Sequence, residues 1–74
     1  MQTMGDRLRV CRKGMKWTQA DLARESGVGI ATVRRIEQHA FEPRIETARR
    51  LAATLRVRAG WLAFGEEPRT KEDW

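Results

Sequence analysis

Residues 18–39, with the sequence TQADLARESGVGIATVRRIEQH, constrain the fold of this chain more than any other segment. Thr18 and Asp21 stand at the spacing of a capping box, so a helix is expected to begin at Thr18. Gly27 is placed to end that helix with a positive φ, which glycine adopts without steric cost. A second helical pattern follows over about 30–38, and arginines lie among its polar positions. Two short helices around a glycine-bearing turn predict a helix-turn-helix.

Three further apolar patterns predict additional helices, and no segment has the alternation of a strand. One helix is expected over 5–14 or 5–15, one from residue 44 or 45 to 55, and a short one over 58–64. The clearest stripe repeats at intervals of three and four and consists of Ile45, Ala48, Leu51, Ala52 and Leu55. The prediction is therefore an all-α domain of five helices over 1–65, followed by a charged, flexible tail over 66–74.

Two single residues, Cys11 and His39, limit how this chain of 74 residues can be stabilised. A domain of this size buries only roughly 60% of its unfolded surface, so additional support is expected. Cys11 has no second cysteine for a disulfide, and one cysteine with one histidine cannot complete a four-ligand zinc site. We therefore expect no metal or cofactor, and association of subunits remains as the source of support. Cys11 itself lies on an apolar helix face and is interpreted as a small buried hydrophobe.

The balance of charge favours a polyanionic partner. The chain has a formal net charge of +5 at pH 7, although charge alone does not identify that partner as a nucleic acid. No apolar run approaches the roughly 20 residues that span a bilayer, and residues 1–6 lack the order of a signal peptide. A cytoplasmic protein with no membrane association is expected.

Several segments, in this order and at this spacing, resemble the Cro/phage-repressor family of helix-turn-helix proteins, often called the XRE family. They are RLRVCR, TQADLA, GVGIATVRRIE, Pro43 and VRAGWLAFGEE, and the resemblance covers residues 4–66. It implies a compact, lambda-repressor-like fold of five helices that binds double-stranded DNA and holds its third helix in the major groove. Lys16, Trp17, Gly29 and His39 depart from the family's usual residues. His39 stands where glycine is common, so either it adopts a left-handed conformation or the third helix ends differently.

The resemblance also implies which side chains meet DNA. Residues that match base-reading positions are Ile30, Ala31, Arg34 and Arg35, and those that match phosphate-binding positions are Gln19, Thr32, Gln38 and Arg44. Arginine can pair bidentately with guanine, whereas Ile30 and Ala31 can offer only apolar contact, for example with a thymine methyl group. The alternative for both arginines is a solvated face that touches phosphate only. The alternative for Ile30 is packing in the core, and for Gln19 it is a solvated position.

Two structural roles follow from the same resemblance. Arg12 and Glu37 match an ion pair that ties the third helix to the first, and two unrelated surface charges are the alternative. The segment 57–64 matches a homodimer surface, for which the candidates are Val57, Arg58, Trp61 and Phe64. Leu62 is assigned to the monomer core, and Trp61 or Phe64 is expected to reach the interface. The alternative is that all the apolar residues of this segment complete the monomer core.

The leading interpretation is a sequence-specific transcriptional regulator of prokaryotic or phage type, a repressor that binds a palindromic operator. A Cro-like phage switch, a restriction–modification controller and an antitoxin that represses its own operon share this architecture. The second interpretation is a protein-interaction module, in which a toxin-like partner binds the charged tail that contains Glu66, Glu67, Glu72, Asp73 and Trp74. An enzyme fits poorly, because the sequence has no nucleophile–base–acid set and no phosphate-cradling glycine loop.

Overall fold

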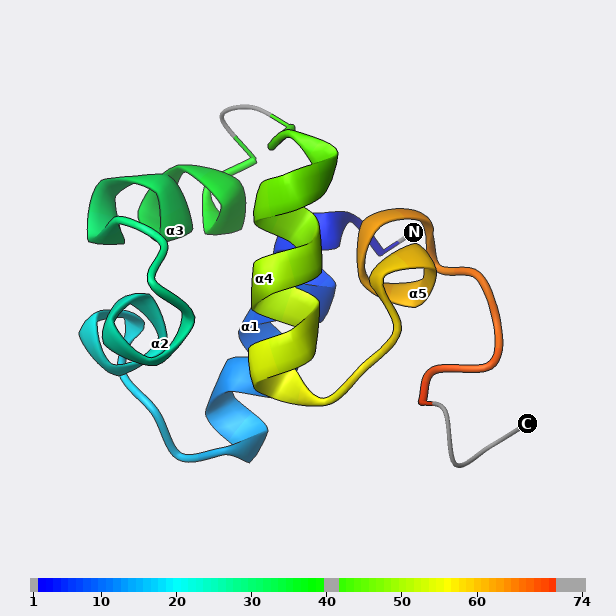
Figure 1. Ribbon diagram of the computed structural model, residues 1–74, viewed down its shortest axis with the longest axis horizontal. Helices are drawn as coiled ribbons and strands as arrows, with labels where there is room; N and C mark the ends of the chain where they lie inside the picture. Colours follow the sequence, from blue (N-terminus) through cyan, green and yellow to red (C-terminus); the bar gives the residue numbers. More distant parts are fainter. Residues whose placement is uncertain (1, 40–41, 71–74) are drawn as a thin grey trace.

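The computed structural model describes residues 2–39 and 42–70, which contain five helices and no strand. The helices are α1 (Met4–Gly14), α2 (Gln19–Ser26), α3 (Ile30–Glu37), α4 (Ile45–Leu55) and α5 (Ala59–Phe64). Figure 1 shows α4 at the centre, with α2 and α3 on one side, α5 on the other and α1 behind. The all-α, five-helix prediction is confirmed. None of the described helices is long and apolar enough to cross a membrane.

The starts of α1 and α2 use the same local device. Thr18 accepts a hydrogen bond from the Asp21 backbone N–H (3.0 Å), and its own N–H donates to the Asp21 carboxylate (2.8 Å). Thr3 and Asp6 form the equivalent box at α1, at 3.2 and 3.1 Å. Because these N–H groups bind the charged carboxylates, the pKa values of Asp6 and Asp21 are lowered. The helix expected from residue 5 therefore begins at Met4, with the box TMGD at the same spacing as TQAD.

Side chains from all five helices make one apolar core. The fully buried hydrophobic residues are Leu8, Leu22, Ile36, Leu51, Leu62 and Val33. Cys11 is also buried, and its burial raises the pKa of the thiol, which agrees with the interpretation of a small hydrophobe. Trp17 packs against the edge of the same core, next to the cap of α2. The core thus holds the helix-turn-helix, α2 and α3, against α1 and α4.

Glycine occupies two helix ends with positive φ and one place where two helices approach closely. Gly27 has φ +73° and Gly65 has φ +76°, as left-handed ends of α2 and α5 require. His39 also adopts a left-handed conformation, with φ +60°, which was one of its two expected alternatives. Gly5 has a different role, because a Cβ there would overlap the backbone carbonyl of Ile36. α1 can therefore lie directly against the end of α3.

The segment after α5 turns back onto the helices. The carbonyl of Arg69 accepts a hydrogen bond from the Arg58 N–H (2.8 Å), and its guanidinium lies 4.8 Å from the centre of the Trp61 ring. Arg69 also donates to the Cys11 sulfur at 3.4 Å. Residues 66–70 thus cover part of α5 and α1. The domain boundary at residue 65 stays a prediction, and residues 71–74 lie outside the described part.

Candidate nucleic-acid interface

The exposed face of α3 is the first element of the candidate site. Ala31, Arg34 and Arg35 are exposed, and Gln38 continues the same face at the C-terminal cap. These positions are spaced by three, four and seven residues, which places them on one side of a helix. The opposite side is buried and consists of Val33, Ile36 and Glu37. α3 therefore turns one polar, arginine-bearing face away from the core, as the sequence pattern predicts.

Ile30 occupies the first turn of α3. It is half-buried, and it does not belong to the apolar core or to the partly buried residues packed against that core. Gly29, at the N-cap, makes no side-chain hydrogen bond to the helix. Ile30 and the exposed Ala31 thus form a small apolar area at the uncapped start of α3. This placement leaves part of the Ile30 side chain accessible at the start of α3.

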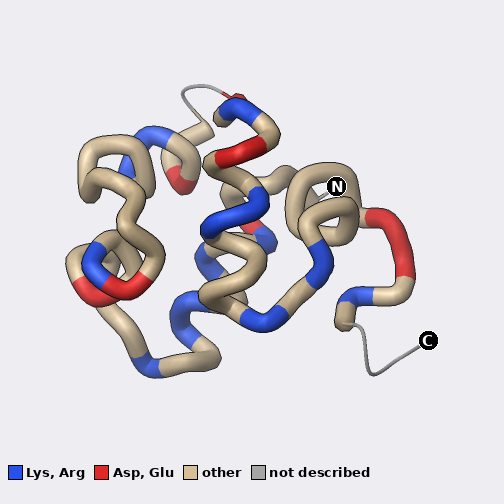
Figure 2. Tube along the Cα trace, viewed as in Figure 1, with Lys and Arg blue, Asp and Glu red and all other residues tan. Residues whose placement is uncertain are grey.

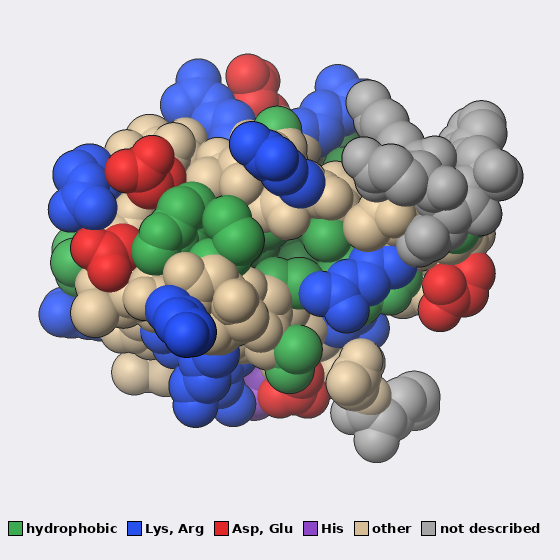
Figure 3. All heavy atoms as spheres, turned by 90° about the horizontal axis from the view of Figure 1, so that it is seen from below, with side chains coloured by type: hydrophobic (Ala, Val, Ile, Leu, Met, Phe, Trp, Pro, Cys, Tyr) green, Lys and Arg blue, Asp and Glu red, His purple; other side chains and the backbone are tan. Residues whose placement is uncertain are grey.

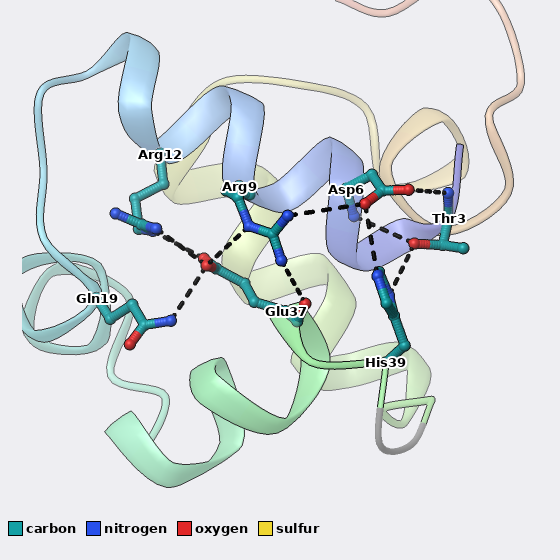
Figure 4. Close-up of polar contacts among 7 residues, drawn as sticks. All are labelled: Thr3, Asp6, Arg9, Arg12, Gln19, Glu37 and His39. Carbon is teal, nitrogen blue, oxygen red and sulfur yellow. Dashed lines mark hydrogen bonds and ion pairs between the residues drawn. The ribbon is translucent and has the colours of Figure 1, made fainter. Parts of the chain in front are cut away.

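Glu37 connects α3 to two other helices. Its carboxylate is 2% exposed and accepts hydrogen bonds from Arg12 Nε (2.7 Å) and Nη2 (3.0 Å). Figure 4 shows Arg12 and Arg9 of α1 and Gln19 of α2 converging on it. Burial opposes ionisation of Glu37, but the hydrogen bonds from Arg12 and Gln19 outweigh it and lower the pKa. The structure thus contains the ion pair between Arg12 and Glu37 that the resemblance implied, as a two-pronged fork.

Two further partners of Glu37, Arg9 and Gln19, were missed by sequence reasoning. Arg9 Nη2 donates to the Glu37 backbone carbonyl at 2.6 Å, and Arg9 Nε lies 3.7 Å from its carboxylate. Gln19 Nε2 donates to Glu37 Oε1 at 3.1 Å. Arg9 stands three residues before Arg12, so the helix period was the signal that could have grouped them. Together these contacts hold the first turn of α2 and the last turn of α3 at one place.

The Gln19 side chain is therefore oriented by the protein itself. It is half-buried and lies in the first turn of α2, where the backbone N–H groups of the helix are directed outward. The contact with Glu37 uses one N–H of its amide, and the other N–H and the carbonyl oxygen remain as polar groups. The solvated alternative considered for Gln19 is thus incomplete, because the side chain has an intramolecular partner.

Two of the phosphate-binding candidates, Thr32 and Arg44, line the same shallow hollow. The hollow lies between the start of α3 and the start of α4, where Arg44 is the N-cap and makes no side-chain cap hydrogen bond. Arg50 lines it as well and was not singled out from the sequence. Gln38, the remaining candidate, lies at the other end of α3. The candidates therefore fall at both ends of the α3 face.

Positive charge alone does not single out α3. Figure 2 shows Lys and Arg positions along α1, α3 and α4 and in the segments between helices, with Asp and Glu positions among them. The view from below shows hydrophobic side chains gathered between basic ones (Figure 3). The α3 face is distinguished instead by the side chains that project from it. On the opposite side of the helix, Glu37 is fixed by its contacts with Arg12.

The candidate dimer residues are separated by their burial. Phe64 is 70% exposed, whereas Trp61 is 9% exposed and belongs to the core cluster. Val57 and Arg58 are half-buried in the turn before α5, and Leu62 is fully buried. Of the two aromatic side chains considered, Phe64 is therefore the one presented to the outside. The tail residues Glu72, Asp73 and Trp74 of the alternative protein-binding interpretation lie outside the described residues.

His39 makes contacts that sequence reasoning did not predict. Its Nδ1 lies 3.0 Å from the Thr3 hydroxyl, and its Nε2 lies 3.5 Å from the Asp6 carboxylate. The end of α3 is thereby joined to the cap of α1 (Figure 4). Among the described residues, no group of three or more His, Cys, Asp or Glu side chains could hold a metal ion.

Comparison with known proteins gives two matches that agree with this geometry. Residues 8–62 match the family model described as helix-turn-helix. A crystal structure of the P22 c2 repressor protein, in complex with synthetic operator 9T in the presence of Tl+, superposes with a TM-score of 0.82. It shares 32% sequence identity, and the alignment covers 89% of this chain and 100% of that chain. A sequence comparison with curated proteins gave no significant match.

Proposed function

This chain belongs to the helix-turn-helix family, and from that premise we propose that it is a DNA-binding transcription regulator. In its finer form, the proposal is a repressor that binds a palindromic operator in double-stranded DNA as a homodimer. The observation that carries it is the α3 face: Ala31, Arg34 and Arg35 project outward while Glu37 fixes the opposite side. A rigid helix that presents arginine at its surface suits the major groove. The similar repressor, which was crystallised with an operator, supports the proposal.

Within this proposal, the contacts with bases come from the exposed face of α3, and the contacts with phosphates come from residues around its two ends. Arg34 and Arg35 read guanine edges, and Ile30 and Ala31 pack against a thymine methyl group. Gln19, Thr32, Gln38 and Arg44 bind phosphates, which position the protein without reading sequence. The contact with Glu37 fixes the orientation of the Gln19 amide, whose other polar groups would then meet the phosphate.

The proposed homodimer uses the surface that contains Phe64, together with Val57 and Arg58. Phe64 carries the argument because a large apolar side chain at 70% exposure is suited to burial against a partner. Trp61, which the resemblance also implied, would contribute from beneath this surface. Two copies related by a twofold axis would place two α3 helices about one DNA turn apart.

Selection of binding sites from random double-stranded DNA tests the function directly. The wild-type protein should enrich a palindrome, and Arg34→Ala should lose base preference at one position of each half-site, a discrimination of about 1–3 kcal/mol. Arg49→Ala, an exposed arginine of α4, removes the same charge as a control and should keep the preference. Enrichment of no sequence by the wild type would exclude sequence-specific recognition.

Gln19→Ala separates positioning from base reading. It should weaken binding to preferred and random sequences by the same factor, because phosphate contacts carry no sequence information. Thermal unfolding of the variant must be measured as well, since the same side chain donates to Glu37. A change in the selected sequence would instead assign base contact to Gln19.

A further inference from the structure

Arg7 of α1 is a buried cation that the DNA-binding face does not use. It is 7% exposed, and its guanidinium donates to the backbone carbonyls of Leu62 (2.8 Å), Ala63 (3.1 Å) and Gln2 (3.1 Å). Within residues 2–39 and 42–70, no carboxylate forms an ion pair with it. Burial of a charge is unfavourable unless polar groups replace its water. Here backbone carbonyls, two of them from α5, take that place.

Among the described residues, no backbone N–H of the following segment donates to the two α5 carbonyls that Arg7 binds. Gly65 N–H donates to the Trp61 carbonyl at 2.7 Å, and Glu66 N–H donates to the Gly60 carbonyl at 3.3 Å. The last carbonyls of a helix need partners from outside it, and a cation there is also favoured by the helix dipole. Arg7 thus supplies part of the C-terminal cap of α5 from a different helix.

α5 depends on this cap more than a longer helix would. It has only 6 residues, its N-cap Arg58 makes no side-chain cap hydrogen bond, and such short helices are not stable alone. Leu62 and Trp61 anchor its inner side in the core. A planar fork on two successive carbonyls adds a polar constraint on rotation about the helix axis, which apolar packing alone restricts less sharply. The direction of the exposed Phe64 is set by that rotation.

We propose that Arg7 is a positioning residue for self-association, which sets the orientation in which α5 presents Phe64 to a second copy of the chain. The inference rests on the proposed homodimer and adds a residue that lies on another helix and stays buried. A lysine keeps the charge but carries its donors on one rotatable nitrogen, so it cannot hold the two carbonyls in the fixed planar geometry of the Arg7 fork. Arg7→Lys is therefore the informative change.

The experiment compares binding to DNA that carries one selected half-site with binding to the full palindrome. Arg7→Lys should leave half-site affinity unchanged, because α3 is untouched, and should lower the advantage of the full site about tenfold, a typical coupling between sites. Arg49→Lys makes the same chemical change at an exposed position of α4 and should alter neither value. An unchanged advantage in Arg7→Lys, or an equal loss for both DNAs, would overturn the proposal.

Phe64→Ala supplies a variant whose folding is not in question, since this side chain is 70% exposed. If Arg7 acts through Phe64, Arg7→Lys should add no further loss of full-site advantage to Phe64→Ala. Additive losses, or an unaffected Phe64→Ala, would count against the inference. Sedimentation of wild type and Arg7→Lys without DNA measures self-association independently of DNA binding. If no DNA is bound the proposed function fails, yet weaker self-association of Arg7→Lys would still support the positioning role, and equal self-association would overturn it.

Discussion

Two arginines of α1 fasten two different parts of the molecule, and they do so by different chemistry. Arg12 meets the carboxylate of Glu37 and ties α1 to α3, whereas Arg7 meets the backbone carbonyls of Leu62 and Ala63 and ties α1 to α5. Both guanidinium groups are mostly withdrawn from water. We call the contacts of Arg12 with Glu37 the α3 corner and the contacts of Arg7 with Leu62 and Ala63 the α5 corner. The α3 corner is an ionic network between side chains. The α5 corner is a helix cap in which only one partner is charged.

This difference determines how each corner responds to change. An ion pair depends on the identity and ionisation of two side chains, so mutation or acid at either partner disrupts it. Backbone carbonyls cannot be mutated or protonated in the same range, so the α5 corner depends on Arg7 and on the path of the backbone alone. The following predictions test that contrast, beginning with the largest effect.

Glu37→Gln should destabilise the protein by about 3 kcal/mol, because removal of one partner leaves the other charges of a buried pair uncompensated. The glutamine amide would also turn a donor toward the donors of Arg12 or Gln19. Chemical denaturation at pH 7 measures the loss. Glu25→Gln is the matched control, since its 3.5 Å pair with Arg24 is exposed and should contribute less than about 1 kcal/mol.

A second and smaller effect on stability shows whether the pairing of Arg12 with Glu37 is itself stabilising, rather than either residue alone. Reversal of both charges, with Arg12→Glu and Glu37→Arg together, should recover about 2 kcal/mol relative to the sum of the single reversals. Recovery will be incomplete because Arg9 and Gln19 also face position 37. A double-mutant cycle by urea denaturation gives the coupling. Purely additive losses would mean that the fork contributes nothing specific to stability.

Acid should weaken the α3 corner and leave the α5 corner intact. The folded-state pKa of Glu37 is lowered from 4.5, so its contribution is fully present above the unfolded value and is lost as pH falls through the folded pKa. Stability should therefore decline as the pH falls below 4.5, and less steeply in Glu37→Gln. Amide exchange corrected for intrinsic rates, measured at pH 6 and below pH 4, should show greater opening in α3 than in α5. Equal opening of both helices would remove the proposed contrast.

The features that could be predicted from the sequence are those with a local physical cause. Capping at Thr18 and Asp21 and the turn at Gly27 depend on neighbouring residues, and the structure contains both. The Thr3–Asp6 box had the same signal and was overlooked. The apolar stripe of α4 is buried from Ala48 onward, but its first member, Ile45, is 54% exposed. The pairing of Arg12 with Glu37 came only from resemblance, because their spacing in the chain carries no geometric information by itself.

The features that could not be predicted depend on how helices meet. Nothing in the sequence marks a backbone carbonyl as an acceptor, so the cap that Arg7 supplies to α5 has no motif. The burial of Trp61 and the exposure of Phe64 follow from the rotation of α5, which a helix of 6 residues does not reveal by its period. Gly5 is similar, because its need arises from the carbonyl of Ile36 on another helix. All of these features depend on packing between helices that are far apart in the sequence.

The helix ends beside the two corners allow the smallest test of the contrast. Gly65 ends α5 at φ +76°, and an added Cβ would lie 3.2 Å from Arg7 Nη1, so Gly65→Ala should cost about 1–2 kcal/mol. His39 ends α3 at a similar φ of +60°, but it is exposed and hydrogen-bonded to Thr3. His39→Gly would relieve backbone strain and lose that contact, so its stability should stay within about 1 kcal/mol of wild type. Thermal unfolding of both variants measures the difference. A large loss in His39→Gly would mean that the contacts of its imidazole, rather than Glu37 alone, hold the end of α3 to α1.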